Sequence, residues 1–315
     1  MKTPRTVIIG VCTYRRAQLR DTLASLAALA SCPDLTIQVI VADNDDTPSA
    51  RPVIDAIGEW FPHPLIYLHA PARNISVARN AILQAARAQC ADLLAFLDDD
   101  EWVEPDWLMR MERRMHEAAT SAVVGPVRAK HLETAPGWMR RSAIHNTTPD
   151  VDARGHAHTG YTCNMLIHLR APAFDGLSFD EALGRSGGED TAFFAAYQAR
   201  GGEIAFAPDA VAHEIVPEAR ATMRWLMRRR YRMGLTHGEV VAAGRPLSGR
   251  LAQAGLAGAK SAACLGLMLA GIFSETARNK AILRLSLHVG VVAGCLGGKR
   301  PEHYGGAAPA VRRAE

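Results

Sequence analysis

Apolar runs alternate with amphipathic stretches along the first hundred residues. Largely apolar runs, typical of strands buried on both faces of a parallel sheet, lie at 6–12, 35–41, 65–68 and 93–97. Between them, leucines at 19, 23, 26 and 29 recur at helical spacing, and further helices are expected at 52–61 and 77–89, the latter with Ser76 as its N-cap. This alternation predicts an α/β protein whose wound, mostly parallel sheet is flanked by helices.

The next hundred residues are less regular. The pattern predicts helices at 107–119 and 191–200 and strands at 122–127, 161–169 and 204–207, and the segment 211–216 follows the last of these strands. Residues 130–160 show little periodicity, as functional loops often do.

Polar side chains follow three of the predicted strands. They form clusters at 13–15 (Thr-Tyr-Arg), 43–45 (Asp-Asn-Asp) and 98–101 (Asp-Asp-Asp-Glu). The carboxyl ends of parallel strands share one edge of a sheet, where such folds bind ligands, so the three clusters should converge. Consecutive carboxylates repel one another, and a divalent metal with oxygen ligands would relieve that repulsion. A solvated acidic turn is the alternative for the third cluster taken alone.

The C-terminal third changes character. Six arginines fall within 220–232, which predicts a helix with a basic face. Two apolar runs follow at 255–273 and 281–296, each short or impure for a spanning helix. An in-plane membrane hairpin and a small helical subdomain fit equally well, and we favour membrane association without a full span. Residues 301–315 are expected to be a disordered tail.

Composition narrows the function further. The 315 residues are 48% hydrophobic with a net charge of +4, which gives no general indication of nucleic-acid binding. Six scattered cysteines without a Cys-x-x-Cys pair indicate a reducing compartment, and the first apolar run is too short for a signal peptide. We therefore expect a cytoplasmic protein. The glycine-rich motifs of dinucleotide and P-loop sites are missing from the sequence.

Five motifs in order resemble glycosyltransferase family two. They are Val-Cys-Thr-Tyr-Arg (11–15), Val-Ala-Asp-Asn (41–44), Ala-Arg-Asn (78–80), Phe-Leu-Asp-Asp-Asp (96–100) and Gly-Gly-Glu-Asp (187–190). The resemblance to the family covers about residues 5–235. Within it, residues 215–234 most resemble bacterial exopolysaccharide transferases of the succinoglycan type. It implies a GT-A domain at 1–235, with a nucleotide-binding half at 1–127 and an acceptor half at 128–235, followed by a helical hydrophobic extension at 236–300.

The resemblance also assigns roles to the nucleotide site. Thr13, Tyr14 and Arg15 would line the nucleotide pocket, and Asp43 would accept a hydrogen bond from the base, usually uracil. Arg79 and Asn80 would contact the nucleotide from the start of their helix. Alternatives from the residues themselves are a turn-capping role for Asp43 and a surface helix pair at 79–80.

For the metal and the chemistry, the resemblance implies an Asp-x-Asp element. Asp100 would bind the metal directly, Asp98 would lie nearer the ribose or a metal-bound water, and Asp99 would be part of the donor site. His213 would be a third metal ligand or else a structural histidine. Asp190 would be the general base, although a helix N-terminus also favours an acid there.

Acceptor or diphosphate contacts are expected from Glu189, Arg220, Arg224 and Arg228, with a solvated basic face as the alternative for the arginines. Arg224 and the tryptophan after it match part of the Gln-x-x-Arg-Trp element of processive synthases, but position 221 is alanine, which favours addition of one sugar.

The expected reaction is inverting and depends on Mn²⁺ or Mg²⁺. A metal stabilises a diphosphate leaving group, and a carboxylate takes the proton of the acceptor hydroxyl in a single displacement. The donor would be a nucleotide sugar, expected to be UDP-linked, and the acceptor a saccharide or a lipid diphosphate at the inner face of the cytoplasmic membrane. A nucleotidyltransferase and a non-catalytic nucleotide-sugar binder are the rival hypotheses.

Overall fold

The computed structural model describes residues 4–298. Contacts within these residues divide them into an α/β unit, residues 4–128 and 146–214, and a helical unit, residues 129–145 and 215–298. The expected boundary at residue 235 lies inside a helix of the second unit. The expected disordered tail at 301–315 lies outside the described residues.

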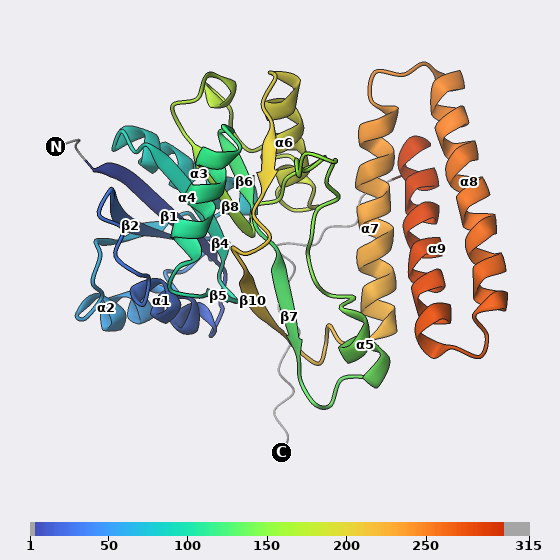
Figure 1. The fold of residues 1–315 in the computed structure, drawn as a ribbon, viewed down its shortest axis with the longest axis horizontal. Coiled ribbons are helices and arrows are strands. Elements are labelled where there is room, and N and C mark those ends of the chain that lie inside the picture. Colours follow the sequence, from blue (N-terminus) through green and yellow to red (C-terminus); the bar gives the residue numbers. More distant parts are fainter. Residues whose placement is uncertain (1–3, 299–315) are drawn as a thin grey trace. The chain divides into compact units, whose positions relative to one another are not determined.

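The α/β unit follows the predicted alternation of strands and helices (Figure 1). Its elements in chain order are β1 (Arg5–Thr13), α1 (Leu19–Ala27), β2 (Leu35–Asp43), α2 (Arg51–Gly58), β3 (Leu65–His69), α3 (Ile75–Ala88), β4 (Leu93–Asp98), β5 (Glu101–Val103), α4 (Trp107–Glu117), β6 (Ala122–Val124), β8 (Asn164–His168), the 3₁₀ turn η1 (Pro172–Phe174), α6 (Glu189–Ala199) and β9 (Ile204–Phe206). Two more strands, β7 (Val127–His131) and β10 (Ala212–Val216), begin in this unit and end in the helical unit.

A seven-stranded sheet in the order β3-β2-β1-β4-β8-β6-β9 forms the centre of this unit. Strand β8 runs antiparallel to both of its neighbours, and the other pairings are parallel. The mostly parallel sheet is therefore confirmed. Strand β10 pairs antiparallel with β5 beside it.

Both faces of the sheet are covered, which explains the uninterrupted apolar runs. Alternate residues of β1 point to opposite faces, so Val7 and Ile9 pack with α1, α2 and α4, whereas Ile8 packs with α3 and α6. Aromatic side chains fill the second face, where the rings of Phe174 and Tyr197 stack with centroids 4.2 Å apart.

Helix α3 begins at Ile75, two residues before the predicted start at residue 77. Ser76 was expected at the N-cap, but Asn74 holds that position with an extended backbone, and its side chain accepts hydrogen bonds from the amides of Ser76 and Val77. Asparagine caps as well as serine does, so residue type could not decide between them.

The helical unit contains α5 (Gly137–Ser142), α7 (Met223–Ala242), α8 (Leu247–Ala270) and α9 (Glu275–Cys295). Helix α7 starts at Met223, not at residue 220, because the Thr222 side chain caps it by accepting from the amide of Trp225. Helix α9 lies between α7 and α8 (Figure 1). None of the described helices combines the length and apolarity that crossing a membrane requires.

Glycines bring α7 and α9 into close contact. Each helix carries two glycines four residues apart, Gly234 and Gly238 on α7 and Gly290 and Gly294 on α9. A Cβ atom on Gly234 would lie 1.9 Å from the carbonyl oxygen of Leu287, and one on Gly290 would lie 2.1 Å from that of Tyr231. Such spacing of small residues allows two helix backbones to approach closely.

Candidate functional site

The ends of β1, β2 and β4 converge, as the sequence predicts. Thr13 is the register partner of Asp43 on β2, and the next residue back, Cys12, is the partner of Asp98 on β4. The hydroxyl of Thr13 donates to Asp99 Oδ2 over 2.8 Å, and the amide of Tyr14 donates to the same oxygen over 3.4 Å. Asp99 thus links the loops that follow β1 and β4.

Two of the three consecutive aspartates face an arginine. Arg16 Nε lies 3.5 Å from Asp99 Oδ1, and Arg16 NH2 lies 3.4 Å from Asp100 Oδ2. Even so, burial raises the pKa of Asp99 to about 7, and the neighbouring Asp100 and Asp98 add to the rise. The arginine therefore offsets only part of the negative charge at this edge of the sheet.

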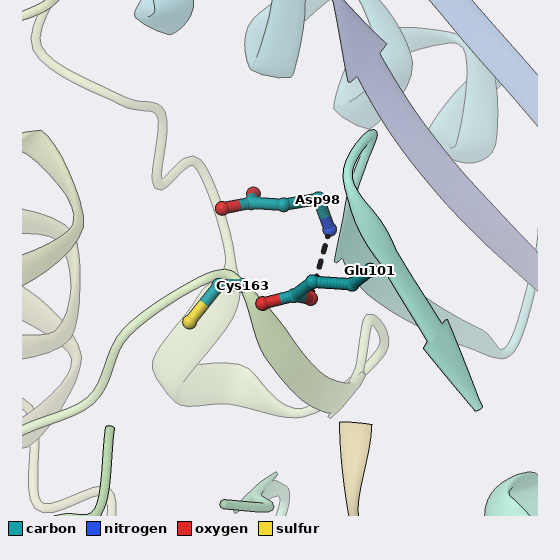
Figure 2. A group of neighbouring side chains, drawn as sticks. All are labelled: Asp98, Glu101 and Cys163. Atoms are coloured by element: carbon teal, nitrogen blue, oxygen red, sulfur yellow. Dashed lines mark hydrogen bonds between the residues drawn. The ribbon is translucent and has the colours of Figure 1, made fainter. Parts of the chain in front are cut away.

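Asp98 is grouped with two side chains that the sequence did not single out as ligands. The ligand atoms of Asp98, Glu101 and Cys163 all lie within 4.8 Å of one another, and Figure 2 shows the three side chains directed toward the same side. Glu101 also has a structural role, since its Oε2 accepts a hydrogen bond from the amide of Asp98 over 3.2 Å. Burial and the nearby Asp98 and Glu214 raise the pKa of Glu101 well above its usual value.

This group fits a divalent cation such as Mg²⁺ or Mn²⁺. Carboxylate oxygens are the donors that these ions prefer, whereas the thiol of Cys163 is a softer donor. Burial, with Glu101 and Asp98 nearby, raises the pKa of that thiol far above its ordinary value. Carboxyl groups whose pKa values rise because other carboxylates surround them would be stabilised by an added positive charge.

His213 lies on the other face of the β5–β10 ribbon. It is the register partner of Trp102, and its ring stacks on the indole with centroids 5.4 Å apart. Glu101 is paired with Glu214, so Glu101 and His213 point in opposite directions across the ribbon. Its Nε2 lies 3.8 Å from Glu104 Oε1. The structure does not group His213 with Asp98, and its role as a ligand stays a prediction.

A pocket of about 230 Å³ opens at the end of β1. Its lining includes Thr13, Arg15 and Arg16 after β1 and Ser49, Ala50 and Val53 from the segment that enters α2. Arg15 has a backbone φ of 52°. Its guanidinium donates two hydrogen bonds, of 2.7 and 2.9 Å, to the carboxylate of Asp45, and these bonds hold the pKa of Asp45 well below its usual value. This is the place where the sequence predicts a nucleotide.

Asp43 is fully buried beneath that pocket. Its carboxylate accepts hydrogen bonds from the amides of Ala50 (2.7 Å) and Asp45 (3.1 Å) and from the Tyr67 hydroxyl (3.1 Å). These bonds fix the loop after β2, which is the turn-capping role considered above. A contact with the nucleotide base stays a prediction.

Arg79 and Asn80 contact protein groups. Arg79 forms a buried ion pair with Glu189, and Asn80 exchanges two hydrogen bonds with the backbone of Phe179, of 2.9 and 2.8 Å. Both side chains face the segment that leads into α6. Their predicted contact with a nucleotide is untested.

Asp190 occupies the first turn of α6, next to Glu189. Its Oδ1 accepts a hydrogen bond from the amide of Thr191 over 2.7 Å. Burial raises the pKa of Asp190 to about 6, helped by Glu189 and opposed by Arg79. A carboxyl group with a pKa near the working pH suits proton transfer.

The three arginines expected to contact acceptor or diphosphate belong to the helical unit. Arg220 precedes α7, and its guanidinium lies 5.9 Å from the centre of the Trp225 ring. Arg224 and Arg228 are exposed on α7. The buried His145 also stacks on that indole, with ring centroids 5.7 Å apart.

Sequence reasoning missed several members of this site. Arg16 directly follows the cluster at 13–15, so its position was the available signal. Cys163 lies on a segment 60 or more residues away from the acidic run, and no local pattern marks it. Cys12 is half-buried near Asp98, and loss of solvent around its thiol raises the pKa of that thiol to about 12.

Known proteins resemble this chain in sequence and in fold. The family model for glycosyl transferase family 2 matches residues 7–172. A protein of Rhizobium meliloti (strain 1021), named succinoglycan biosynthesis protein ExoM, is 46% identical over 297 residues, which is 94% of this chain and 95% of that protein.

Two solved structures share the fold at lower identity. The mannosyltransferase PcManGT from Pyrobaculum calidifontis, in complex with GDP-Man and Mn²⁺, superposes with a TM-score of 0.66 at 17% identity, covering 95% of this chain and 89% of that one. S. aureus TarS 1–349 with UDP-GlcNAc gives a TM-score of 0.51 at 12% identity, covering 97% and 98%. At these identities the likeness is evidence of a GT-A-like fold.

Proposed function

Because the chain belongs to glycosyl transferase family 2 and is a glycosyltransferase, we propose that it adds one sugar from a nucleotide sugar during assembly of a cell-surface polysaccharide. The name of the 46% identical relative supports the polysaccharide. The acceptor would be a saccharide or a lipid-linked saccharide. Membership in this family of enzymes argues against the two rival hypotheses, a nucleotidyltransferase and a non-catalytic nucleotide-sugar binder.

For the donor, we propose a UDP-linked sugar bound at the end of β1. The pocket beside Thr13 and Arg15 supports this placement, since the guanidinium of Arg15 has N–H groups beyond the two that bond Asp45, and these could donate to phosphate or ribose oxygens. The complexes of PcManGT with GDP-Man and of TarS with UDP-GlcNAc show that enzymes of this fold bind nucleotide sugars.

A divalent cation, Mn²⁺ or Mg²⁺, would be held by Asp98 and Asp100, with Glu101 beside them. When bound, such a cation supplies positive charge to a diphosphate leaving group. The chain's own contribution is to fix these carboxylates: Thr13 and Arg16 orient Asp99, and Glu101 holds the amide of Asp98. The grouping of the ligand atoms of Asp98, Glu101 and Cys163 within 4.8 Å of one another is the observation that favours a cation here.

Asp190 would act as the general base. Its Oδ1 is engaged by Thr191, so Oδ2 is the atom that would take the proton of the acceptor hydroxyl. The pKa of about 6 leaves the carboxylate mostly ionised at neutral pH while keeping it basic enough to accept a proton. Direct displacement by one acceptor oxygen would invert the anomeric centre. The location of Asp190, close enough to Asp98 to be affected by its charge, carries the proposal.

Donor hydrolysis tests this function. UDP or GDP release from UDP-glucose, UDP-GlcNAc and GDP-mannose is measured with Mn²⁺, with Mg²⁺ and with a chelator. We expect metal-dependent release by the wild-type chain and a loss of about a hundredfold or more in Asp100→Asn and Asp190→Asn, since general base catalysis alone contributes that much. Asp175→Asn, which changes an exposed aspartate away from the cluster, is the matched control. Full turnover by both site variants would contradict the assignment.

We further propose that the protein lies at the inner face of the cytoplasmic membrane through α8. Leu247, Leu251, Leu265 and Leu269 share one side of that helix by their spacing and are 51–73% exposed, and Phe273 after the helix is fully exposed. No acidic residue occurs between Glu239 and Glu275 in the sequence.

Charge favours an anionic lipid surface as the partner. Over residues 129–145 and 215–298 the sequence has fifteen lysines and arginines and four acidic residues. An apolar helix face in a strongly basic unit is typical of proteins that lie in the plane of an anionic membrane.

Vesicle flotation tests this partner. We expect the protein to float with vesicles that contain phosphatidylglycerol and not with phosphatidylcholine alone. The variant Leu247→Ser/Leu269→Ser/Phe273→Ser should sediment free, whereas Trp60→Ser, an exposed aromatic of the α/β unit, should float. If the triple variant floats like the wild type, or if wild-type protein dimerises through this face and ignores vesicles, the proposal fails.

A further inference from the structure

Arg79 and Glu189 form a buried ion pair at the start of α6, next to the proposed base Asp190. Their side chains are only 7% and 4% exposed. Glu189 is the first residue of α6 and Asp190 is the second. Glu189 Oε2 is buried and has no hydrogen-bond partner among the described residues, so this carboxylate depends on the guanidinium for its neutralisation.

Helix α3, which carries Arg79, also holds the segment before α6. Asn80 bonds the backbone of Phe179 in both directions, and Ser76 Oγ donates to the carbonyl of Asp180 over 2.8 Å. Three side chains from consecutive turns of α3 therefore contact the chain on both sides of the link at 181–188.

That link ends in two glycines with left-handed backbones. Gly187 and Gly188 have φ values of 87° and 96°. A Cβ atom on Gly187 would meet nothing within 4 Å, so the space where a side chain would stand is open. Glycine allows this backbone conformation, and the ion pair with Arg79 is a contact that holds the first turn of α6 just beyond the two glycines.

We propose that Arg79 is a positioning residue for the proposed base, acting through Glu189, and that it does not contact the donor. The guanidinium lies 5.7 Å from the centre of the Phe179 ring, which packs it in place, and its charge is felt by Glu189, Asp98 and Asp190. It thus fixes the first turn of α6 and balances the acids around it. The inference rests on the proposed role of Asp190.

The test compares Arg79→Lys, Arg79→Met and the double variant Arg79→Met/Glu189→Met. Binding of UDP and of GDP is measured by calorimetry, and kcat and KM are measured for the sugar nucleotide that the wild type hydrolyses. We expect kcat to fall by about tenfold or more in Arg79→Met, with partial rescue in Arg79→Lys, while KM and the nucleotide Kd stay within about twofold. Arg87→Met, on the same helix and bonded to the Phe174 carbonyl, is the matched control.

The double variant guards against simple misfolding. Removing both charges leaves no unpaired buried ion, so this protein should fold even where Arg79→Met does not. We expect it to bind nucleotide like the wild type with the same reduced kcat. A normal kcat in the folded double variant, or a tenfold rise in nucleotide Kd with an unchanged kcat in Arg79→Lys, would overturn the inference. A wild-type protein that binds neither nucleotide would instead overturn the proposed function.

Discussion

Adding one methyl group to Gly290 should separate α7 from α9. A Cβ atom there would lie 2.1 Å from the carbonyl oxygen of Tyr231 and 3.0 Å from the amide nitrogen of Leu235. Both are backbone atoms, so no side-chain rotation relieves the overlap. The two helices must move apart along their length for Gly290→Ala to fit.

The expected cost follows from two opposing terms. Alanine in a helix is better than glycine by about 1 kcal/mol, which stabilises any Gly→Ala variant in this unit. Overpacking costs about 1–3 kcal/mol and more where a backbone must shift. Contact at 2.1 Å with backbone places Gly290→Ala at the upper end of that range, so we expect a net loss of about 2 kcal/mol.

A glycine on α8 provides the control. A Cβ atom on Gly258 would meet nothing within 4 Å, so Gly258→Ala should cause no steric overlap and should be stabilised by the higher helix propensity of alanine. The same substitution should therefore stabilise one helix of the unit and destabilise another. Hydrogen exchange of the amides in α7 and α9 measures both effects, because each 1.4 kcal/mol changes local opening about tenfold.

We expect faster exchange across α7 and α9 in Gly290→Ala and equal or slower exchange in Gly258→Ala. Exchange in α1 and α3 of the α/β unit should be unchanged in both. If Gly290→Ala protects α7 and α9 as well as the wild type does, the close approach of these two helices is not what holds the unit together.

Four further outcomes concern the acidic site. Because Asp190 must be a carboxylate to act as base, kcat should fall as the pH drops through about 6 and reach about a tenth of its plateau near pH 5, which a pH–rate profile checks. The pKa of Asp99 is about 7 in the folded chain, whereas an unfolded aspartate releases its proton near pH 4. Between these pH values the folded chain binds one more proton, so the free energy of unfolding should fall as the pH rises. Mn²⁺ should therefore raise the melting temperature more at pH 8 than at pH 5. Thr13→Val removes a donor to Asp99 and should cost about 1–3 kcal/mol in a denaturant titration, with Thr148→Val as an exposed control.

Local sequence patterns are sufficient to predict those features of the fold that depend on a single strand or helix. The apolar runs of β1, β2 and β4 are long enough to show burial on both faces, and the polar residues after each run fix where the strand ends. Parallel order then brings Thr13, Asp43 and Asp98 to the same edge. The convergence of the three clusters is confirmed for that reason.

Partners far apart in the sequence were beyond such reasoning. Arg79 and Glu189 are separated by 110 residues, and the pairing depends on how α6 returns to the sheet. The antiparallel direction of β8 likewise has no local signature, yet it brings Cys163 beside Asp98. In the C-terminal third, hydropathy marked two apolar runs but not the paired glycines that join α7 to α9.

Charge at the sheet edge links these findings. Asp98, Asp99, Asp100 and Glu101 come from one turn, and Glu189 and Asp190 come from α6, whereas the nearby cations described above are Arg16 and Arg79. A diphosphate would add further negative charge to this edge. Burial, and after it the neighbouring carboxylates, raise the pKa values of Asp99, Glu101 and Asp190, and the same carboxylates would oppose donor binding without an accompanying cation. Under the proposed function, the acidic run would therefore make nucleotide binding depend on a metal, and it would not contact the sugar directly.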